Sequence, residues 1–240
     1  TTGASLVAMG YEALCANTTG ISNTALGREA LRANTTGNCN VAVGIGALDL
    51  NTTGTDNVAV GRDAGGCQTT ASNNVAIGAA TLFKNTGANN TAVGYLASMC
   101  NTTGTDNIAV GGCSLKAGTT GANNTAIGFR SGCAMLVGSQ NVLAGYLSGR
   151  DTNNGSCNVF LGVCAGYNNT SGYRNIVVGR ASAISAGDAN TQTVIGTALT
   201  GKGTSTAFVG GSQGTFNEAN TTAWQQTSDR RIKKNIVDNN

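Results

Sequence analysis

A short alternation of polar and apolar positions recurs along most of the chain. Each occurrence runs from an asparagine through a Val, Ile or Thr, a small apolar residue and an aliphatic residue to a glycine, as in residues 40–44. Successive side chains of a β-strand point to opposite faces, so the segment predicts a short strand. Because its third and fourth residues are both apolar, we expect both faces of that strand to be buried.

The glycine that ends this segment recurs every 17 residues, with one interval of 16. The recurring glycines are Gly10, Gly27, Gly44, Gly61, Gly78, Gly94, Gly111, Gly128, Gly145, Gly162, Gly179 and Gly196. They define twelve tandem units with the pattern N-(V/T)-A-(V/I)-G-x-x-(A/S)-L-x-x-N-T-T-G-x-x. We number positions from this glycine, so that the strand covers −4 to −1 and the glycine of N-T-T-G is +10.

The N-T-T-G segment, for example 34–37, is the second recurring element. Asparagine bonds its own backbone and glycine adopts positive φ at low cost, which favours a turn. We expect a short strand that ends in this turn. The 16-residue unit loses its one residue here, at 85–87.

These features predict an all-β protein, a β-solenoid (β-roll) of about twelve 17-residue coils. Regular glycine and β-branched residues disfavour helix, and the apolar segments are about half the length that transmembrane barrel strands need. Two short strands and two turns would form each coil. Twelve coils at ~4.8 Å would make a rod of roughly 55–60 Å with like residues stacked in columns.

A roll this thin has a poor core, so we expect a second copy of the chain to cover one strand face. Small alanines would permit close approach near a symmetry axis. The prediction is a homo-oligomer, specifically a homotrimer. The alternative is a monomeric solenoid with an exposed alanine face.

Composition narrows the function classes. The 240 residues contain 36 glycines and no proline or histidine, and only 10% are charged. Imidazole metal sites and catalytic sites that need histidine are therefore excluded. The net charge of +3 does not indicate nucleic-acid binding. Because no apolar run reaches the ~20 residues of a membrane span, we expect no membrane insertion. We also expect no cofactor and no bound metal.

The cysteines do not share a column in neighbouring coils. They are Cys15, Cys39, Cys67, Cys100, Cys113, Cys133, Cys157 and Cys164. Stacked positions two or more coils apart exceed the ~7 Å between Cα atoms that a disulfide allows. We expect free cysteines that act as small apolar or turn residues, and disulfides between columns or between chains stay open.

Other chemistry is sparse. Glu12 and Glu29 stack in adjacent coils, with Asp63 in the same column two coils further on. We expect the neighbouring Arg28 and Arg62 to neutralise these acids on a solvated face.

A carbohydrate-cleaving spike needs two carboxylates close together, yet Asp56 and Asp106, which share a column, lie three coils apart. The threonine columns suggest an ice-binding solenoid as an alternative function, although only one threonine of each pair would point outward. The N-x-(S/T) sequences, for example at Asn17 and Asn34, match the glycosylation sequon, but we expect them first of all to form turns.

The chain changes character after Gly196. The segment 201–227 is polar and irregular apart from an imperfect thirteenth strand at 208–210, and 228–236 reads S-D-R-R-I-K-K-N-I. That string resembles the start of the endosialidase-type intramolecular chaperone of phage tail fibres. The repeats resemble those that precede this chaperone in tail-fibre-domain proteins, and the β-roll heads of trimeric autotransporter adhesins.

The resemblance implies three regions: a repeat domain at 1–200, a connector at 201–227 and the start of a truncated chaperone at 228–240. It also implies a trimer and self-cleavage at the Ser228–Asp229 bond, with Ser228 as nucleophile and Lys233 as its base. Apart from that step, we expect no enzyme activity.

The resulting functional prediction is a trimeric rod of a phage tail fibre that mediates host attachment. Its partners would be a host-surface glycan or protein receptor and other fibre or virion proteins. Its location would be the virion, or the extracellular space or cell surface. The main alternative is a bacterial surface adhesin or self-assembling extracellular filament. The carbohydrate-cleaving spike and the ice-binding solenoid are weaker alternatives than the adhesin or filament.

Overall fold

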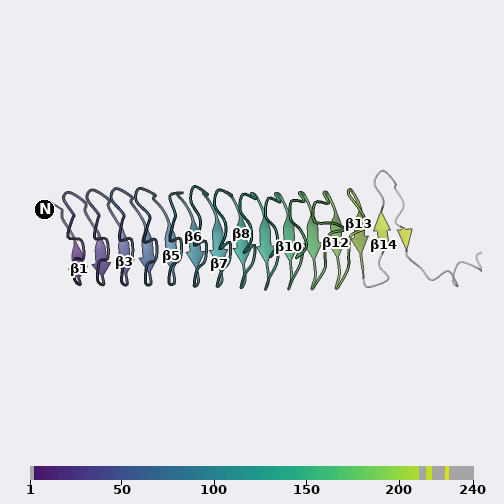
Figure 1. The fold of residues 1–240 in the computed structure, drawn as a ribbon, viewed down its shortest axis with the longest axis horizontal. Coiled ribbons are helices and arrows are strands. Elements are labelled where there is room, and N and C mark those ends of the chain that lie inside the picture. Colours follow the sequence, from purple (N-terminus) through teal and green to yellow (C-terminus); the bar gives the residue numbers. More distant parts are fainter. Residues whose placement is uncertain (1–2, 211–214, 218–224, 227–240) are drawn as a thin grey trace, which may run out of the picture.

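The computed structural model describes residues 3–210, 215–217 and 225–226, and it forms a β-solenoid, as the repeat predicts. Each coil contributes one three-residue strand (Figure 1). The strands are β1 Val7–Met9, β2 Thr24–Leu26, β3 Val41–Val43, β4 Val58–Val60, β5 Val75–Ile77, β6 Thr91–Val93, β7 Ile108–Val110, β8 Thr125–Ile127, β9 Val142–Ala144, β10 Val159–Leu161, β11 Ile176–Val178, β12 Thr193–Ile195 and β13 Ala207–Val209.

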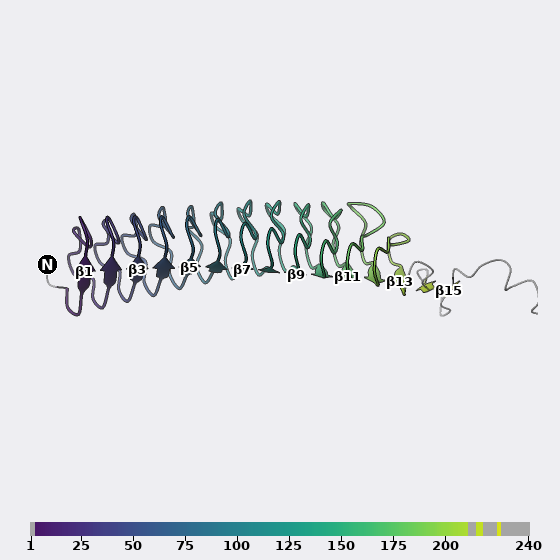
Figure 2. The same ribbon diagram turned by 90° about the horizontal axis from the view of Figure 1, so that it is seen from below.

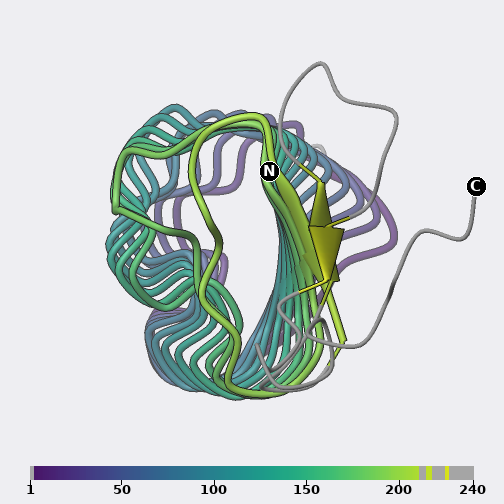
Figure 3. The same ribbon diagram turned by 90° about the vertical axis from the view of Figure 1, so that its right-hand side faces the viewer.

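The strands β1–β13 form one parallel sheet in which every strand pairs only with its sequence neighbours. The register never slips: Ala42 lies opposite Ala59, and Val43 lies opposite Val60. Equivalent side chains therefore stack in columns along the rod. Figure 3, which looks along the rod, shows the backbones of successive coils lying one behind the other. Thirteen strands at ~4.8 Å spacing give a sheet about 58 Å long.

The N-T-T-G segment is a turn, so the expectation of a second strand in each coil is wrong. The amides of Thr35, Thr36 and Gly37 all donate to one carbonyl, that of Thr52. The Asn34 Nδ2 donates to the Gly37 carbonyl at 3.0 Å. Local side-chain bonds and convergent amides thus replace the evenly spaced ladder that a strand requires.

Within a single chain the strand buries one face, and burial of its other face against a second copy stays a prediction. In β4, Ala59 is fully buried, whereas Val58 and Val60 on either side of it are only half-buried. The alanine column at −2 faces the interior of the coil. The expectation that these alanines contact a neighbouring chain is therefore wrong. Its small size suits a thin coil in which residues at +3 and +4, such as Ala47 and Leu48, fill the opposite wall.

In later coils the side chain at −2 becomes larger and the residue at +4 becomes smaller, so that the core stays filled. Leu143 and Phe160 replace alanine at −2, and glycine replaces leucine at +4 in the facing wall. A β-carbon on Gly132 would lie 2.7 Å from Leu143 Cδ1. The larger side chain therefore occupies space that the missing leucine leaves, as close packing requires.

The buried asparagine column at −4 ties successive coils together. Asn40 Nδ2 donates to the Gly54 carbonyl at 2.8 Å, and Asn40 Oδ1 accepts from the Asn57 amide at 3.0 Å. The arrangement repeats in each coil from Asn23 to Asn175. The asparagines are fully buried because their hydrogen bonds are satisfied within the stack.

Glycine at position 0 is required by close approach. At Gly44 the backbone has φ +132°, and an added β-carbon would lie 2.6 Å from the Gly61 carbonyl oxygen. The coil also takes the left-handed conformation at +2, +4 and +12, even where leucine or aspartate stands there, as at Leu48 and Asp56.

The sheet reverses direction after β13 (Figure 1), at the end of the stack opposite to the N-terminus (Figure 2). Strand β14, Thr215–Asn217, pairs antiparallel with β13, and β15, Gln225–Gln226, pairs antiparallel with β14. Strand β13 itself pairs in parallel with β12, so the segment 201–227 contains three short strands.

Candidate functional site: the outward face of the sheet

The strand side chains at −3 and −1 point outward and form an uncharged surface along the rod. Each of the thirteen strands presents two such positions. All are apolar except for four threonines, which are Thr24, Thr91, Thr125 and Thr193. A sheet face this free of charge is unusual for a surface that stays in water.

Position +1 extends this surface past the corner at position 0. It carries four half- to largely exposed aromatic residues, Tyr11, Tyr95, Phe129 and Tyr146. The rings of Phe129 and Tyr146 stack with centroids 5.8 Å apart. We call the columns −3, −1 and +1 together the apolar face. Fifteen of the twenty-one exposed large hydrophobic residues in the described part of the chain lie on it.

Charge appears only at one border of the apolar face. Arg28, Arg62 and Arg180 stand at +1. Arg28 and Arg62 each lie 3.7 Å from the carboxylate that follows, Glu29 and Asp63 respectively, which confirms the expectation that these two arginines neutralise neighbouring acids. The strand columns −3 and −1 themselves carry no charged residue.

One further ion pair joins two coils away from this face. Arg32 Nε donates to Asp49 Oδ1 at 2.7 Å, and its second nitrogen donates to Oδ2 at 3.0 Å. This hydrogen bonding to the carboxylate raises the pKa of Arg32. Because the pair is solvent-exposed, its contribution to stability is small.

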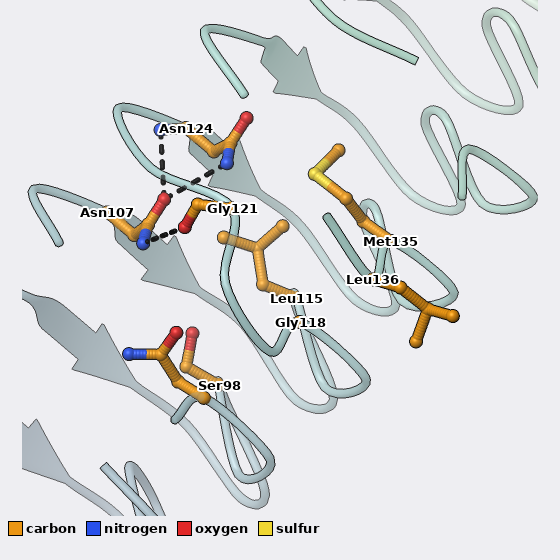
Figure 4. Close-up of a pocket in the computed structure, with 9 residues that line it drawn as sticks. Ser98, Asn107, Leu115, Gly118, Gly121, Asn124, Met135 and Leu136 are labelled. Carbon is orange, nitrogen blue, oxygen red and sulfur yellow. Dashed lines mark hydrogen bonds between the residues drawn. The ribbon is translucent and has the colours of Figure 1, made fainter. Parts of the chain in front are cut away.

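The described residues offer few groups or cavities in which a ligand could be held. Within them, no three His, Cys, Asp or Glu side chains are grouped so as to hold a metal ion. A small pocket of about 10 Å³ is lined by residues that include Leu115, Gly118 and Met135 (Figure 4). That volume holds one water at most, so the pocket is too small for a substrate.

All eight cysteines are free, which confirms the expectation within one chain. Burial raises the pKa of the Cys67 and Cys133 thiols. These two thiols therefore stay protonated at neutral pH, whereas nucleophilic cysteines need a lowered pKa.

The threonine columns are largely committed to the fold. At +8 the hydroxyl donates to the carbonyl one coil on, as from Thr35 to Thr52 at 3.1 Å. Only the +9 threonines, such as Thr53, are exposed throughout. The sequon asparagines Asn17 and Asn34 are 2% and 0% exposed, which agrees with turn chemistry.

The proposed cleavage residues, Ser228 and Lys233, lie outside the described residues. The apolar face lies on the side of the strand opposite to the alanine column, where the sequence predicted the contact between chains. The signal was present: the −3 column holds only Val, Ile, Thr and one Ala, which no solvated strand face would require.

Among the residues that the structure describes, no helix has the length and apolar character needed to cross a bilayer. Comparison with protein-family models, with curated proteins and with solved structures finds no match to this chain.

Proposed function

We propose that the chain is the rod of a homotrimeric fibre, with the apolar faces of three copies turned towards a common axis. The apolar face carries this proposal. It runs along the whole sheet, it holds most of the exposed large hydrophobic residues, and charge reaches only its border.

The size of the face suits an obligate interface. A sheet about 58 Å long and about five residues wide at ~3.3 Å each presents roughly 900 Å². The largest apolar patch on a typical monomer is about 300–600 Å², and a stable interface buries about 800 Å² per partner. Two flat sheets could also stack as a dimer. The repeat's resemblance to trimeric fibre proteins supports three copies.

The fibre's role is inferred from its shape. A stiff column of stacked coils can hold a binding surface away from the particle that carries it. We propose a phage tail fibre that attaches to a glycan or protein on the host surface. The same rod could serve in a bacterial adhesin or extracellular filament, which has the same shape but a different location.

Light scattering of the full chain tests the assembly. We expect a particle of three times the chain mass of 23.9 kDa, and a stable folded monomer would overturn the proposal. Mass spectrometry of purified virions tests the location, because a tail fibre is present in them and a bacterial adhesin is not.

The resemblance adds a self-cleavage step at the Ser228–Asp229 bond, with Lys233 as base. In the longer protein that includes the whole chaperone, Ser228→Ala should keep the chaperone attached, as seen by gel electrophoresis. Continued release would exclude Ser228 as the nucleophile.

A further inference from the structure

The turn at +8 to +10 directs several hydrogen-bond donors onto one carbonyl oxygen of the next coil. The Thr52 carbonyl oxygen accepts from the three amides of 35–37 at 2.9, 3.2 and 3.3 Å, and from the Thr35 hydroxyl at 3.1 Å. All these bonds recur in the turns that begin at Thr18, Thr102 and Thr170. Successive amides arranged in this way form a backbone nest, a concave set of donors that suits an electron-rich oxygen.

The turn at 68–71 has the same donors but lacks the acceptor. Within the described part of the chain, the amides of Thr69, Thr70 and Ala71 make no hydrogen bond, and neither does the Thr69 hydroxyl. In every other coil up to the tenth, at least the amide at +8 donates to the coil that follows. Among these coils, the nest at 69–71 is therefore the one that no protein oxygen satisfies.

The cause is the missing residue in the facing turn. The next coil carries only Asn85, Thr86 and Gly87 where other coils carry N-T-T-G. Asn85 Nδ2 donates to the Gly87 carbonyl at 2.7 Å, and the Gly87 amide donates to Asn85 Oδ1 at 3.2 Å, so this turn closes on itself. Among the described residues, no donor reaches the Thr86 carbonyl. The shortened turn thus does not present its carbonyl to the nest.

The donors themselves keep the conformation of a complete turn. Gln68 Nε2 donates to the Ala71 carbonyl at 3.0 Å, which is the bond that asparagine makes from this position in other coils. The Thr69 carbonyl accepts from the Thr52 amide at 2.7 Å and from the Thr52 hydroxyl at 3.1 Å. Because these bonds hold the turn in its usual shape, we expect its three free amides to converge as they do in other coils.

The two coils remain joined on either side of the nest. The Cys67 amide donates to the Phe83 carbonyl at 2.9 Å, just before the turn. The −4 asparagines form a ladder of hydrogen bonds along the rod, and the Asn74 amide continues it with a 3.0 Å bond to Asn57 Oδ1. The lost bonds are thus confined to the turn, and the surrounding stack holds the donors in place before a ligand arrives.

The surroundings of the nest favour a negative charge. Residues 69–70 are exposed, so a solute can reach the amides from the solvent. Lys84, two residues before Thr86, is the only charged residue between Asp63 and Asp106 in the sequence. Its side chain is exposed and makes no ion pair with the described residues.

We propose that the amides of 69–71 and the Thr69 hydroxyl bind a small oxyanion, a phosphate or a carboxylate group, in the position that a carbonyl oxygen takes in other coils. An anion suits converging donors better than water does, because a water molecule must turn its own two hydrogens away from them. Hydrogen bonds to a charged oxygen are also about twice as strong as those to a neutral one. The nest lies outside the apolar face, so the proposal does not depend on the trimer or on the fibre's role.

Nuclear magnetic resonance of the isotope-labelled full chain tests the site. When inorganic phosphate is added at constant ionic strength, we expect saturable shifts of the Thr69, Thr70 and Ala71 amide signals and none at 35–37, whose donors already hold the Thr52 carbonyl. Galacturonic acid, as a second probe, shows whether a carboxylate on a sugar enters as a free ion does, and saturable shifts confined to 69–71 with either probe support the site. If neither probe gives a saturable shift, the proposal is wrong. Shifts of equal size in both turns would indicate an adventitious ion only, which also overturns it.

Variants of the turn test the donors. A threonine inserted between Thr86 and Gly87 completes N-T-T-G and restores the carbonyl, so phosphate should bind about tenfold or more weakly. Thr69→Val removes the hydroxyl donor and should weaken phosphate binding about threefold or more, whereas the matched Thr35→Val should leave it unchanged. Should the insertion variant fold and still bind phosphate as the unmodified chain does, or should the two valine variants bind it equally well, the nest is not the binding site.

Discussion

The ring of Phe160 occupies the space that a β-carbon on Gly166 would fill. Phe160 stands at −2, where seven earlier strands carry buried alanine, and Gly166 stands at +4, where five of the first seven coils carry leucine. The two walls of the coil therefore exchange bulk while the total volume between them stays nearly constant. Such volume-conserving exchange is what a closely packed interior tolerates best.

Replacing Gly166 with alanine should destabilise the rod strongly. Gly166 has φ +61°, so any other residue is strained, and its β-carbon would also overlap the Phe160 ring. Left-handed strain costs about 1 kcal/mol and overpacking about 1–3 kcal/mol more. Thermal unfolding followed by circular dichroism measures the loss.

Two variants separate these effects. Gly46→Ala has the same strain at φ +65°, but its β-carbon would meet the mobile carboxylate of Asp63, so we expect only the smaller loss. Phe160→Ala with Gly166→Leu recreates the arrangement of the early coils and should recover much of the stability. A double variant no more stable than Gly166→Ala would contradict the size-exchange argument.

The sequence predicted the period, the strand position and the stacking because one constraint sets all three. The carbonyl approach at position 0 admits only glycine, as at Gly44, and this recurs visibly. The sequence did not show which face of the strand points inward, because the consecutive residues Ala59 and Val60 point to opposite faces and both are apolar. Burial distinguishes them, because only the smaller residue fits a thin coil.

The turn at N-T-T-G was misread for a different reason. Paired threonines favour strands, yet here Asn34 bonds locally and Thr35 uses its hydroxyl on the next coil. The left-handed residues at +4 were also missed. Glycines at this position in other coils, such as Gly65 and Gly132, were the available signal.

Val60→Asp should abolish assembly and leave the fold of each chain intact. Val60 lies half-buried on the apolar face, so a carboxylate there is solvated in the monomer but loses its water when copies associate. We expect light scattering to show monomers and circular dichroism to show an unchanged β spectrum.

Ala59→Asp and Thr53→Asp are the matched changes. Ala59 is fully buried, so an aspartate at that position should unfold the chain, whereas Thr53 is exposed outside the apolar face and should tolerate one. A Val60→Asp protein that still assembles as the unmodified chain does would show that this face is not the interface.

The thiols of Cys67 and Cys133 should react slowly with iodoacetamide at neutral pH. Burial raises their pKa values, so the thiolate fraction at pH 7 is smaller than in a free cysteine derivative. A thiol whose pKa is higher in the folded state favours folding at low pH, and this contribution falls as pH rises above the unfolded thiol's pKa of about 8.5. Peptide mapping after timed alkylation gives the rate at each site. Rates at pH 7 equal to those of N-acetylcysteine would contradict the expected protection.

Removing one rung of the −4 ladder should cost more than removing a surface hydroxyl. Asn40→Ala deletes the bond to the Gly54 carbonyl and leaves the buried Asn57 amide without its acceptor. Because each unsatisfied buried group costs about 1–3 kcal/mol, we expect a loss of roughly 2–5 kcal/mol. Thr53→Ala, at an exposed position, should lie within about 0.5 kcal/mol of the unmodified chain. Urea unfolding of both variants measures the difference, and equal midpoints would show that the asparagine column fills space without holding the coils together.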